Sequence, residues 1–176
     1  GVKIKWIDCD DNGIIKIEDF LSTITDKTKL ISITQMSNVL GSEIPLKEII
    51  KVAHENNIRV LVDGCQGIAH LDTDVQDLDC DYYVFSGHKT YGPSGIGVLY
   101  GKENILNELP PYQGGGGMIN EVTLEGVSFA DLPAKYEAGT PPLVEAHGLG
   151  IALDYMNSIG VKNIFEHEKE LSKYAL

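Results

Sequence analysis

A lysine stands where a strand-like run ends in the stretch DYYVFSGHKTYGPSGIG, residues 81–97. The apolar run is followed by Ser86, His88 and Lys89, and glycines and a proline then turn the chain at once. An amine that is buried loses part of its preference for the charged form, and the free amine attacks carbonyl compounds. Lys89 is therefore a candidate for covalent chemistry with an aldehyde, although a lone lysine is far more often a solvated surface residue.

A carboxylate and an amide follow a second strand-like run, IRVLVDGCQG, residues 58–67. Its apolar residues end on Asp63, and Gln66 lies on the turn that follows. Because functional groups of α/β proteins collect at the carboxyl ends of parallel strands, we expect Asp63 and Lys89 to lie side by side. Taken alone, Asp63 fits equally well as the N-cap of a helix.

An amine and a carboxylate in this arrangement match the needs of pyridoxal 5′-phosphate (PLP). PLP forms a Schiff base with a lysine, and a carboxylate against its ring nitrogen keeps the ring protonated and electron-withdrawing. Its phosphate needs hydroxyl, imidazole or backbone N–H donors, and Ser86, His88 and the nearby glycines offer them. These residues predict a PLP site with no metal ion.

Strand-like and helix-like segments alternate along the chain. This pattern predicts an α/β fold with a mostly parallel sheet and helices on both of its faces. The strands that we expect are residues 3–8, 30–34, 58–63, 82–85 and 96–100. A short Gly-Pro-Ser-Gly turn joins the last two, so they should pair as antiparallel neighbours. The run GGGG, residues 114–117, predicts a loop.

Three helices are predicted from apolar spacing. They are residues 17–24, a helix opened by Pro45, and a long helix from Pro141 to about Ser158. The buried face of the second should consist of Leu46, Ile49, Ile50 and Ala53. The buried face of the third should consist of Leu143, Ala146, Leu149, Leu153 and Met156.

The composition argues against several kinds of partner. The formal net charge is −12 with no basic stripe, which disfavours nucleic acid. No run approaches a membrane span, and no signal peptide is visible. Cys9, Cys65 and Cys80 lack the spacing of a zinc site or a disulfide framework. They predict reduced thiols and a cytoplasmic location.

Several stretches resemble the class V aminotransferase family of PLP enzymes of fold type I, and especially its SufS-type cysteine desulfurases. They are SGHKTYGPSGIGVLYG, LVDGCQGIAHLDTDVQDLDCDYYVFSGHK, SNVLGSEIPLKEI, GGGGMI and KYEAGTPPLVEAHGLGIALDY. The resemblance covers nearly the whole chain. It implies that residues 1–176 form the central part of a cofactor-binding large domain that continues beyond both ends.

The resemblance implies a role for each residue around the two strand ends. Lys89 would hold PLP through its amine and move the α-proton of the substrate. Asp63 would pair with the ring nitrogen, and Gln66 would hydrogen-bond the ring's 3-hydroxyl. Ser86 and His88 would hold the phosphate, although His88 fits a simpler role as the cap of its turn.

Two further residues gain roles in the same way. Asn38 would lie near the ring and the substrate carboxylate, with an Asx turn as the structural alternative. Thr140 would reach the phosphate bound by a second subunit, because family members are homodimers with shared sites. Cys65 stands where relatives commonly have alanine, and a small core thiol is its simplest role.

The implied activity is that of a cysteine desulfurase, which converts L-cysteine to L-alanine and passes sulfur to an acceptor, for example in iron–sulfur cluster assembly. The family's persulfide-forming Cys and carboxylate-binding Arg would follow this chain, so we expect the chain alone to be inactive. Another class V aminotransferase or a kynureninase-like lyase stays open. Two alternatives outside this family also stay open. One is a non-catalytic module that binds a nucleotide, which the missing G-x-x-x-x-G-K-[ST] and G-x-G-x-x-G patterns disfavour. The other is an inert structural fragment.

Overall fold

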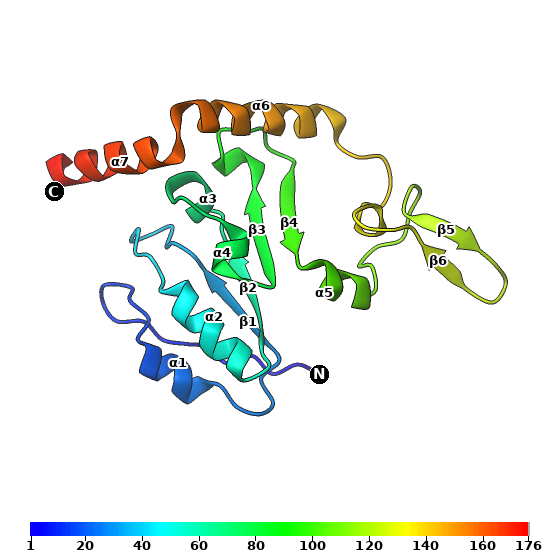
Figure 1. The fold of residues 1–176 in the computed structure, drawn as a ribbon, viewed down its shortest axis with the longest axis horizontal. Helices are drawn as coiled ribbons and strands as arrows, with labels where there is room; N and C mark the ends of the chain where they lie inside the picture. The colour runs from blue at the N-terminus through cyan, green and yellow to red at the C-terminus, as the bar shows by residue number, and fades with distance from the viewer. Residues whose placement is uncertain (176) are drawn as a thin grey trace.

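A computed structural model describes residues 1–175 and centres on a four-stranded sheet (Figure 1). The strands lie in the order β1 (Leu30–Thr34), β2 (Arg59–Asp63), β3 (Tyr82–Ser86) and β4 (Gly97–Gly101). β1, β2 and β3 are parallel, and β4 is antiparallel to β3. The mixed, mainly parallel sheet confirms the expected α/β class. The expected helices on both faces are not found in this range, because Leu30 and Ser32 on one face of β1 are exposed.

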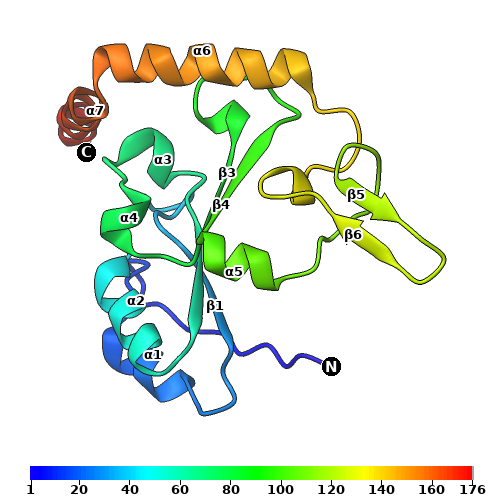
Figure 2. The same cartoon turned by 45° about the vertical axis from the view of Figure 1, so that its right-hand side comes forward.

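Seven helices accompany the sheet within the described residues. They are α1 (Ile17–Thr23), α2 (Leu46–Glu55), α3 (Gly67–His70), α4 (Val75–Leu78), α5 (Glu103–Glu108), α6 (Leu143–Ile159) and α7 (Val161–Ala175). α1 to α4 lie together on one side of the strands, and α6 crosses the edge at which β3 ends (Figures 1 and 2). None of these helices has the length and apolar character needed to cross a bilayer.

The helix opened by Pro45 forms as predicted and supplies much of the core. The expected residues Leu46, Ile49, Ile50 and Ala53 are all buried. They pack in one cluster with the inward residues of β1 and β2, which are Ile31, Ile33, Val60 and Val62. The alternate residues of β1 are exposed, so within residues 1–175 the helical layer covers only one face of this strand.

The strand expected at residues 3–8 is absent. This segment is extended without pairing to another strand, and Val2, Ile4 and Trp6 are 96%, 73% and 84% exposed. Alternation of apolar and polar residues fits a strand, but a strand forms only where a neighbour accepts its backbone hydrogen bonds. Nothing in the local sequence determines that neighbour.

The buried face of α6 differs in part from the prediction. Leu149 and Met156 are buried as expected, whereas Leu143 and Ala146 are exposed. The buried part of α6 lies over the chain that follows η1, where Gly148 approaches Pro93 and the Tyr155 ring contacts the Tyr91 ring. Leu143, at the start of α6, is 68% exposed.

A two-stranded hairpin, β5 (Ile119–Val122) and β6 (Val127–Phe129), was not predicted. It extends away from the main sheet, and its side chains are exposed (Figure 2). The GGGG run that precedes it is a loop, as expected. The carbonyl of Gly116 in this loop accepts a hydrogen bond from the amide of Gly139 at 2.8 Å.

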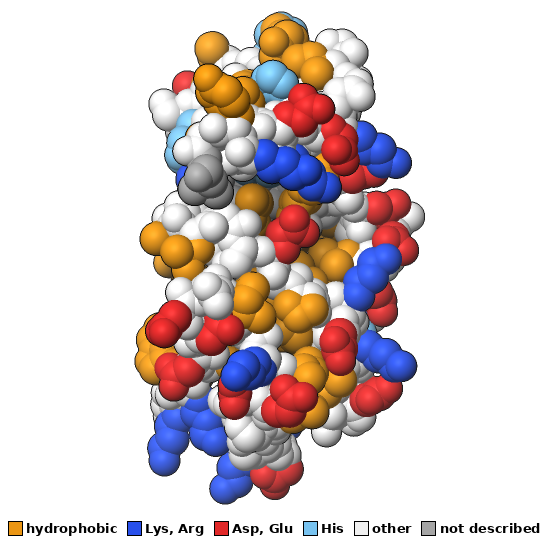
Figure 3. Space-filling view, turned by 90° about the vertical axis from the view of Figure 1, so that its left-hand side faces the viewer, with side chains coloured by type: hydrophobic (Ala, Val, Ile, Leu, Met, Phe, Trp, Pro, Cys, Tyr) orange, Lys and Arg blue, Asp and Glu red, His pale blue; other side chains and the backbone are white. Residues whose placement is uncertain are grey.

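Helix α7 docks near the end of α3 through one ion pair and one side-chain hydrogen bond. Lys162 lies 3.2 Å from Asp72, and the Nδ1 atom of His70 lies 2.8 Å from Glu168. A groove beneath α7 is lined by apolar and charged residues, among them Leu71, Leu78, Phe165, Asp74 and Glu166. Figure 3 shows apolar side chains in the hollow of this face, with acidic and basic side chains around them.

Candidate active site

Strands β2 and β3 bring their polar end residues to one edge of the sheet. The register pairs Asp63 with Val84, and alternation along β3 then puts Ser86 on the same face as Asp63. The Sγ atom of Cys65 lies 3.8 Å from the Oγ atom of Ser86, which brings the two strand-end turns into contact. Lys89 follows three residues after Ser86, at the end of the 3-10 turn η1 (Gly87–Lys89).

The turn that carries Lys89 is fixed by a single carbonyl. The oxygen of Gly87 accepts hydrogen bonds from the Thr90 amide at 3.0 Å, the Thr90 hydroxyl at 2.8 Å and the Gly92 amide at 3.1 Å. Thr90 is fully buried, so it holds the turn from inside. The side chains of His88 and Lys89 are left exposed.

Two expectations for this turn are wrong. Thr90 caps the turn, so the alternative role of His88 as its cap does not hold. Lys89 is exposed, so the burial expected for it is not found within residues 1–175. No hydrogen bond joins the Nζ atom of Lys89 to another described residue, and the amine is therefore free to meet a ligand.

The turn after β2 presents Asp63 in a fixed backbone. The Asp63 carbonyl accepts a hydrogen bond from the Gln35 amide at 2.9 Å, and the Gly64 amide donates to Val84 at 2.8 Å. One carboxylate oxygen, Oδ1, accepts from the Cys65 amide at 3.0 Å. The N-cap position of α3 belongs to Gln66, so the alternative of Asp63 as a helix N-cap is wrong. The Asp63 carboxylate is exposed, which leaves its other oxygen accessible.

Asn38 lies on the turn after β1, beside the same edge. The hydroxyl of Ser37 accepts hydrogen bonds from the backbone amides of Val39 and Leu40, both at 3.2 Å. The side chain that holds this turn is therefore that of Ser37, and the structural Asx alternative for Asn38 is wrong. Asn38 itself is exposed.

Thr140 is not brought to the strand ends by a hydrogen bond within residues 1–175. It is exposed and lies between Gly139, which is tied to the GGGG loop, and the first residue of α6. Its expected role requires a second subunit and stays a prediction.

Sequence reasoning missed two buried polar residues beneath the site, Gln35 and Tyr83. Gln35 follows directly after β1, and Tyr83 lies in the middle of β3. Burial raises the pKa of the Tyr83 phenol above its ordinary value, so the hydroxyl stays neutral and remains a donor. Gln35 could have been noticed because it is a polar residue directly after an apolar strand. Tyr83 has no sequence feature that distinguishes it from other aromatic residues in strands.

The three cysteines are free, as expected. Cys80 is fully buried, and burial raises the pKa of its thiol to about 11. Cys65 is half-buried beside Ser86, and Cys9 is exposed. Only Cys65 lies near the strand ends that carry the candidate residues.

The side chains at this edge fit PLP by their chemistry. A free amine, an accessible carboxylate, a hydroxyl and an imidazole come from two adjacent strand ends, and the backbone of both turns is fixed by hydrogen bonds. These are the groups required by the aldehyde, the ring nitrogen and the phosphate of PLP.

Comparison with known proteins decides the family. The model of the aminotransferase class-V family matches residues 1–176, the entire chain. The chain belongs to the aminotransferase class-V family. It is 49% identical over 177 aligned positions to a cysteine desulfurase of Shigella sonnei, and the match covers 100% of this chain and 44% of that protein. This family member thus spans less than half the length of the curated relatives that it matches.

Solved structures of related proteins show the same fold. The apo cysteine desulfurase of Thermococcus onnurineus superposes with a TM-score of 0.92 at 35% identity, over 98% of this chain and 43% of that one. A C-DES mutant with glycine covalently linked to its PLP cofactor superposes with a TM-score of 0.76 at 29% identity, over 85% of this chain and 40% of that one. The fold of this class-V chain is therefore that of fold-type I PLP enzymes.

Proposed function

We propose that this chain is the lysine-bearing part of a PLP-dependent cysteine desulfurase, which converts L-cysteine to L-alanine. The observation that carries the proposal is the convergence of Lys89, Asp63 and Ser86 at adjacent strand ends in a chain 49% identical to a cysteine desulfurase. Membership of the family alone does not determine the reaction. The sequence identity to cysteine desulfurases favours desulfuration of L-cysteine.

Each residue at the edge has a distinct task in this proposal. Bound PLP would supply an electron-withdrawing ring conjugated to the α-carbon of the substrate. Lys89 would hold the cofactor through Nζ and then carry the α-proton of the substrate. The accessible oxygen of Asp63 would hold a proton on the ring nitrogen, and the Gln66 amide would donate to the ring's 3-hydroxyl.

The remaining residues would bind the rest of the ligand. Ser86 and His88 would donate to the phosphate from the start of the rigid turn around Gly87. Asn38 would lie beside the ring and the substrate carboxylate. Thr140 would complete the phosphate site of a second copy in a homodimer.

The sulfur of the substrate would leave as a persulfide on a thiol and pass to an acceptor protein in the cytoplasm. The thiols of this chain are poor candidates for that step. Cys80 is buried with a pKa of about 11, and Cys65 lies on the short turn that also carries Asp63. A thiolate is the required nucleophile, so we expect residues 1–176 alone not to release alanine from L-cysteine.

A titration with PLP tests the cofactor assignment. The purified chain should gain a visible absorption band, Lys89→Ala should lose it, and the surface control Lys47→Ala should keep it. Lys47 is a suitable control because its amine is two-thirds exposed and pairs only with Asp77. An equal band in Lys89→Ala, or none in the unsubstituted chain, would contradict the proposal.

Proton exchange tests the reaction on the same PLP-loaded protein. In deuterated water the proposed product, L-alanine, should exchange its α-proton when Lys89 is present and should not in Lys89→Ala. Exchange that persists without Lys89 would show that another base moves the proton.

A further inference from the structure

Two buried side chains, one from the residue after β1 and one from β3, meet directly beneath the turn that carries Asp63. The Tyr83 hydroxyl donates to the Oε1 atom of Gln35 at 2.6 Å, and the two residues are 1% and 9% exposed. The Nε2 atom of Gln35 donates to the Thr73 hydroxyl at 2.9 Å. Both ends of the Gln35 amide are therefore satisfied inside the protein.

The backbone of the turn lies in contact with this pair. A Cβ atom on Gly64 would lie 1.9 Å from the Tyr83 ring, and a Cβ atom on Gly67 would lie 1.9 Å from Oε1 of Gln35. Neither distance is compatible with a side chain, so only glycine allows the turn to approach so closely. Tyr83 and Gln35 thus form the surface on which residues 64–67 rest.

The same two residues also bond to the turn's backbone. The backbone N–H of Gln35 donates to the Asp63 carbonyl at 2.9 Å. The Tyr83 hydroxyl lies 3.5 Å from the Gly64 carbonyl. Asp63 and Gln66 lie at the two ends of this short segment. A change in the height or tilt of the turn would move both functional groups together.

We propose that Tyr83 and Gln35 are positioning residues, which hold the turn after β2 so that the Asp63 carboxylate meets the ring nitrogen of PLP. This inference rests on the proposed function. Neither side chain would contact the cofactor, because both lie beneath the turn and away from the exposed face of Asp63. They act through the backbone that carries the carboxylate.

The test compares Tyr83→Phe with Tyr100→Phe. Tyr100 lies opposite Tyr83 on β4, and its hydroxyl makes no hydrogen bond within residues 1–175, so it is a matched control. In the chain without PLP, the Gly64 and Ile68 amides of Tyr83→Phe should exchange with deuterium roughly tenfold faster than in the control.

The decisive readout is the pH midpoint of the visible band after PLP is bound. Asp63→Asn should shift this midpoint because it weakens the hold on the ring proton. Tyr83→Phe should shift it in the same direction by a smaller amount, and the double variant should shift it no further than Asp63→Asn alone. Borohydride should still link PLP to Lys89 in every variant.

The outcomes separate this inference from the proposed function. An unmoved midpoint in Tyr83→Phe, with the midpoint of Asp63→Asn shifted, would reduce Tyr83 to a purely structural role and overturn the inference alone. A missing band in the unsubstituted chain would overturn both. If Tyr83→Phe does not fold, Gln35→Leu removes the same hydrogen bond from the other side, and it should reproduce the shift or contradict the inference.

Discussion

At the scale of single residues, Ser86 offers a selective test of how the phosphate is held. Its hydroxyl lies at the end of β3 on the face of Asp63. A hydrogen bond to a charged group contributes about 1.5–3 kcal/mol. Ser86→Ala should therefore weaken PLP binding roughly 10- to 100-fold, as measured by titration of the visible band.

Pyridoxal, which lacks the phosphate, supplies the control for Ser86. Its affinity should be the same for the unsubstituted chain and for Ser86→Ala. The exposed Ser94, in the following turn, is the matched position, and Ser94→Ala should leave PLP binding unchanged. Equal losses for PLP and pyridoxal would show that Ser86 does not act on the phosphate.

The cysteines should differ sharply in their reactivity. Cys80 is fully buried and its pKa is raised to about 11 by burial, so almost no thiolate forms at pH 8 in the folded chain. Cys9 is exposed. At pH 8, iodoacetamide followed by peptide mapping should label Cys9 first and Cys80 only after urea is added. Early labelling of Cys80 in the folded protein would contradict its assigned burial.

The sequence predicts the residues of the candidate site only where they stand at the end of an apolar strand. Asp63 and Ser86 end two apolar runs, so the meeting of these two strand ends was predictable from the rule for parallel sheets. Gln35 and Tyr83 were not predictable, because their importance comes from contacts between residues that are distant in sequence. Tyr83 lies 19 residues from Gly64 and 48 residues from Gln35. The exposure of Lys89 likewise depends on packing that local sequence does not encode.

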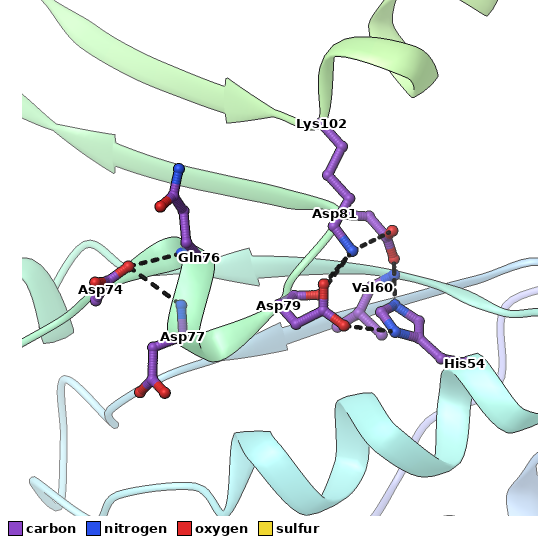
Figure 4. Close-up of polar contacts among 8 residues, drawn as sticks. All are labelled: His54, Val60, Asp74, Gln76, Asp77, Asp79, Asp81 and Lys102. Carbon is purple, nitrogen blue, oxygen red and sulfur yellow. Dashed lines mark hydrogen bonds and ion pairs between the residues drawn. The ribbon is translucent and has the colours of Figure 1, made fainter.

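At the scale of secondary structure elements, a network of charged and polar side chains lies at the edge of the sheet away from the candidate site. It joins the start of β2 and β3 to the end of β4 (Figure 4). Asp81, just before β3, is 5% exposed and accepts the Val60 amide at 2.7 Å and the Nε2 atom of His54 at 3.0 Å. Lys102, just after β4, lies 3.6 Å from Asp81 and 2.6 Å from Asp79. One buried carboxylate thus connects α2, β2, β3 and β4.

Removal of that carboxylate should destabilise the fold without touching the candidate site. Asp81→Ala leaves the Val60 amide and the His54 ring without a partner, and should lower the free energy of unfolding by about 3 kcal/mol. Asp81→Asn should cost less because its amide oxygen still accepts. Urea titration measures both values.

The exposed pair of Asp77 with Lys47 supplies the comparison for Asp81. Both side chains are 66% exposed, so Asp77→Ala should change the free energy of unfolding by less than about 1 kcal/mol. A cost for Asp81→Ala as small as that of Asp77→Ala would show that the network does not hold the strands together.

Regular elements were predictable where the apolar pattern is long or the turn chemistry is strong. β1 has the expected bounds, and the buried face of α2 is the expected one. The four-residue helix α4 was missed, although Asp74 caps it by accepting the amides of Gln76 and Asp77. The hairpin β5–β6 was missed because its exposed strands lack the alternation that a buried face imposes.

At the scale of the whole molecule, strand β1 at the edge of the sheet has one covered and one uncovered face within residues 1–175. The exposed alternate residues of β1 and the accessible carboxylate of Asp63 lie on the uncovered side. The relatives are more than twice as long as this chain, which covers 44% of the first of them. Residues 3–8 likewise pair with no strand within residues 1–175.

The central claim is that Lys89 is the residue that holds PLP, and covalent trapping tests it most directly. The chain is incubated with PLP, reduced with borohydride, digested, and mapped by mass spectrometry. We predict one dominant modified peptide that carries the cofactor on Lys89, with Lys47 and the other exposed lysines modified only in trace amounts. Modification spread evenly over the lysines, or a dominant adduct elsewhere, would contradict the account.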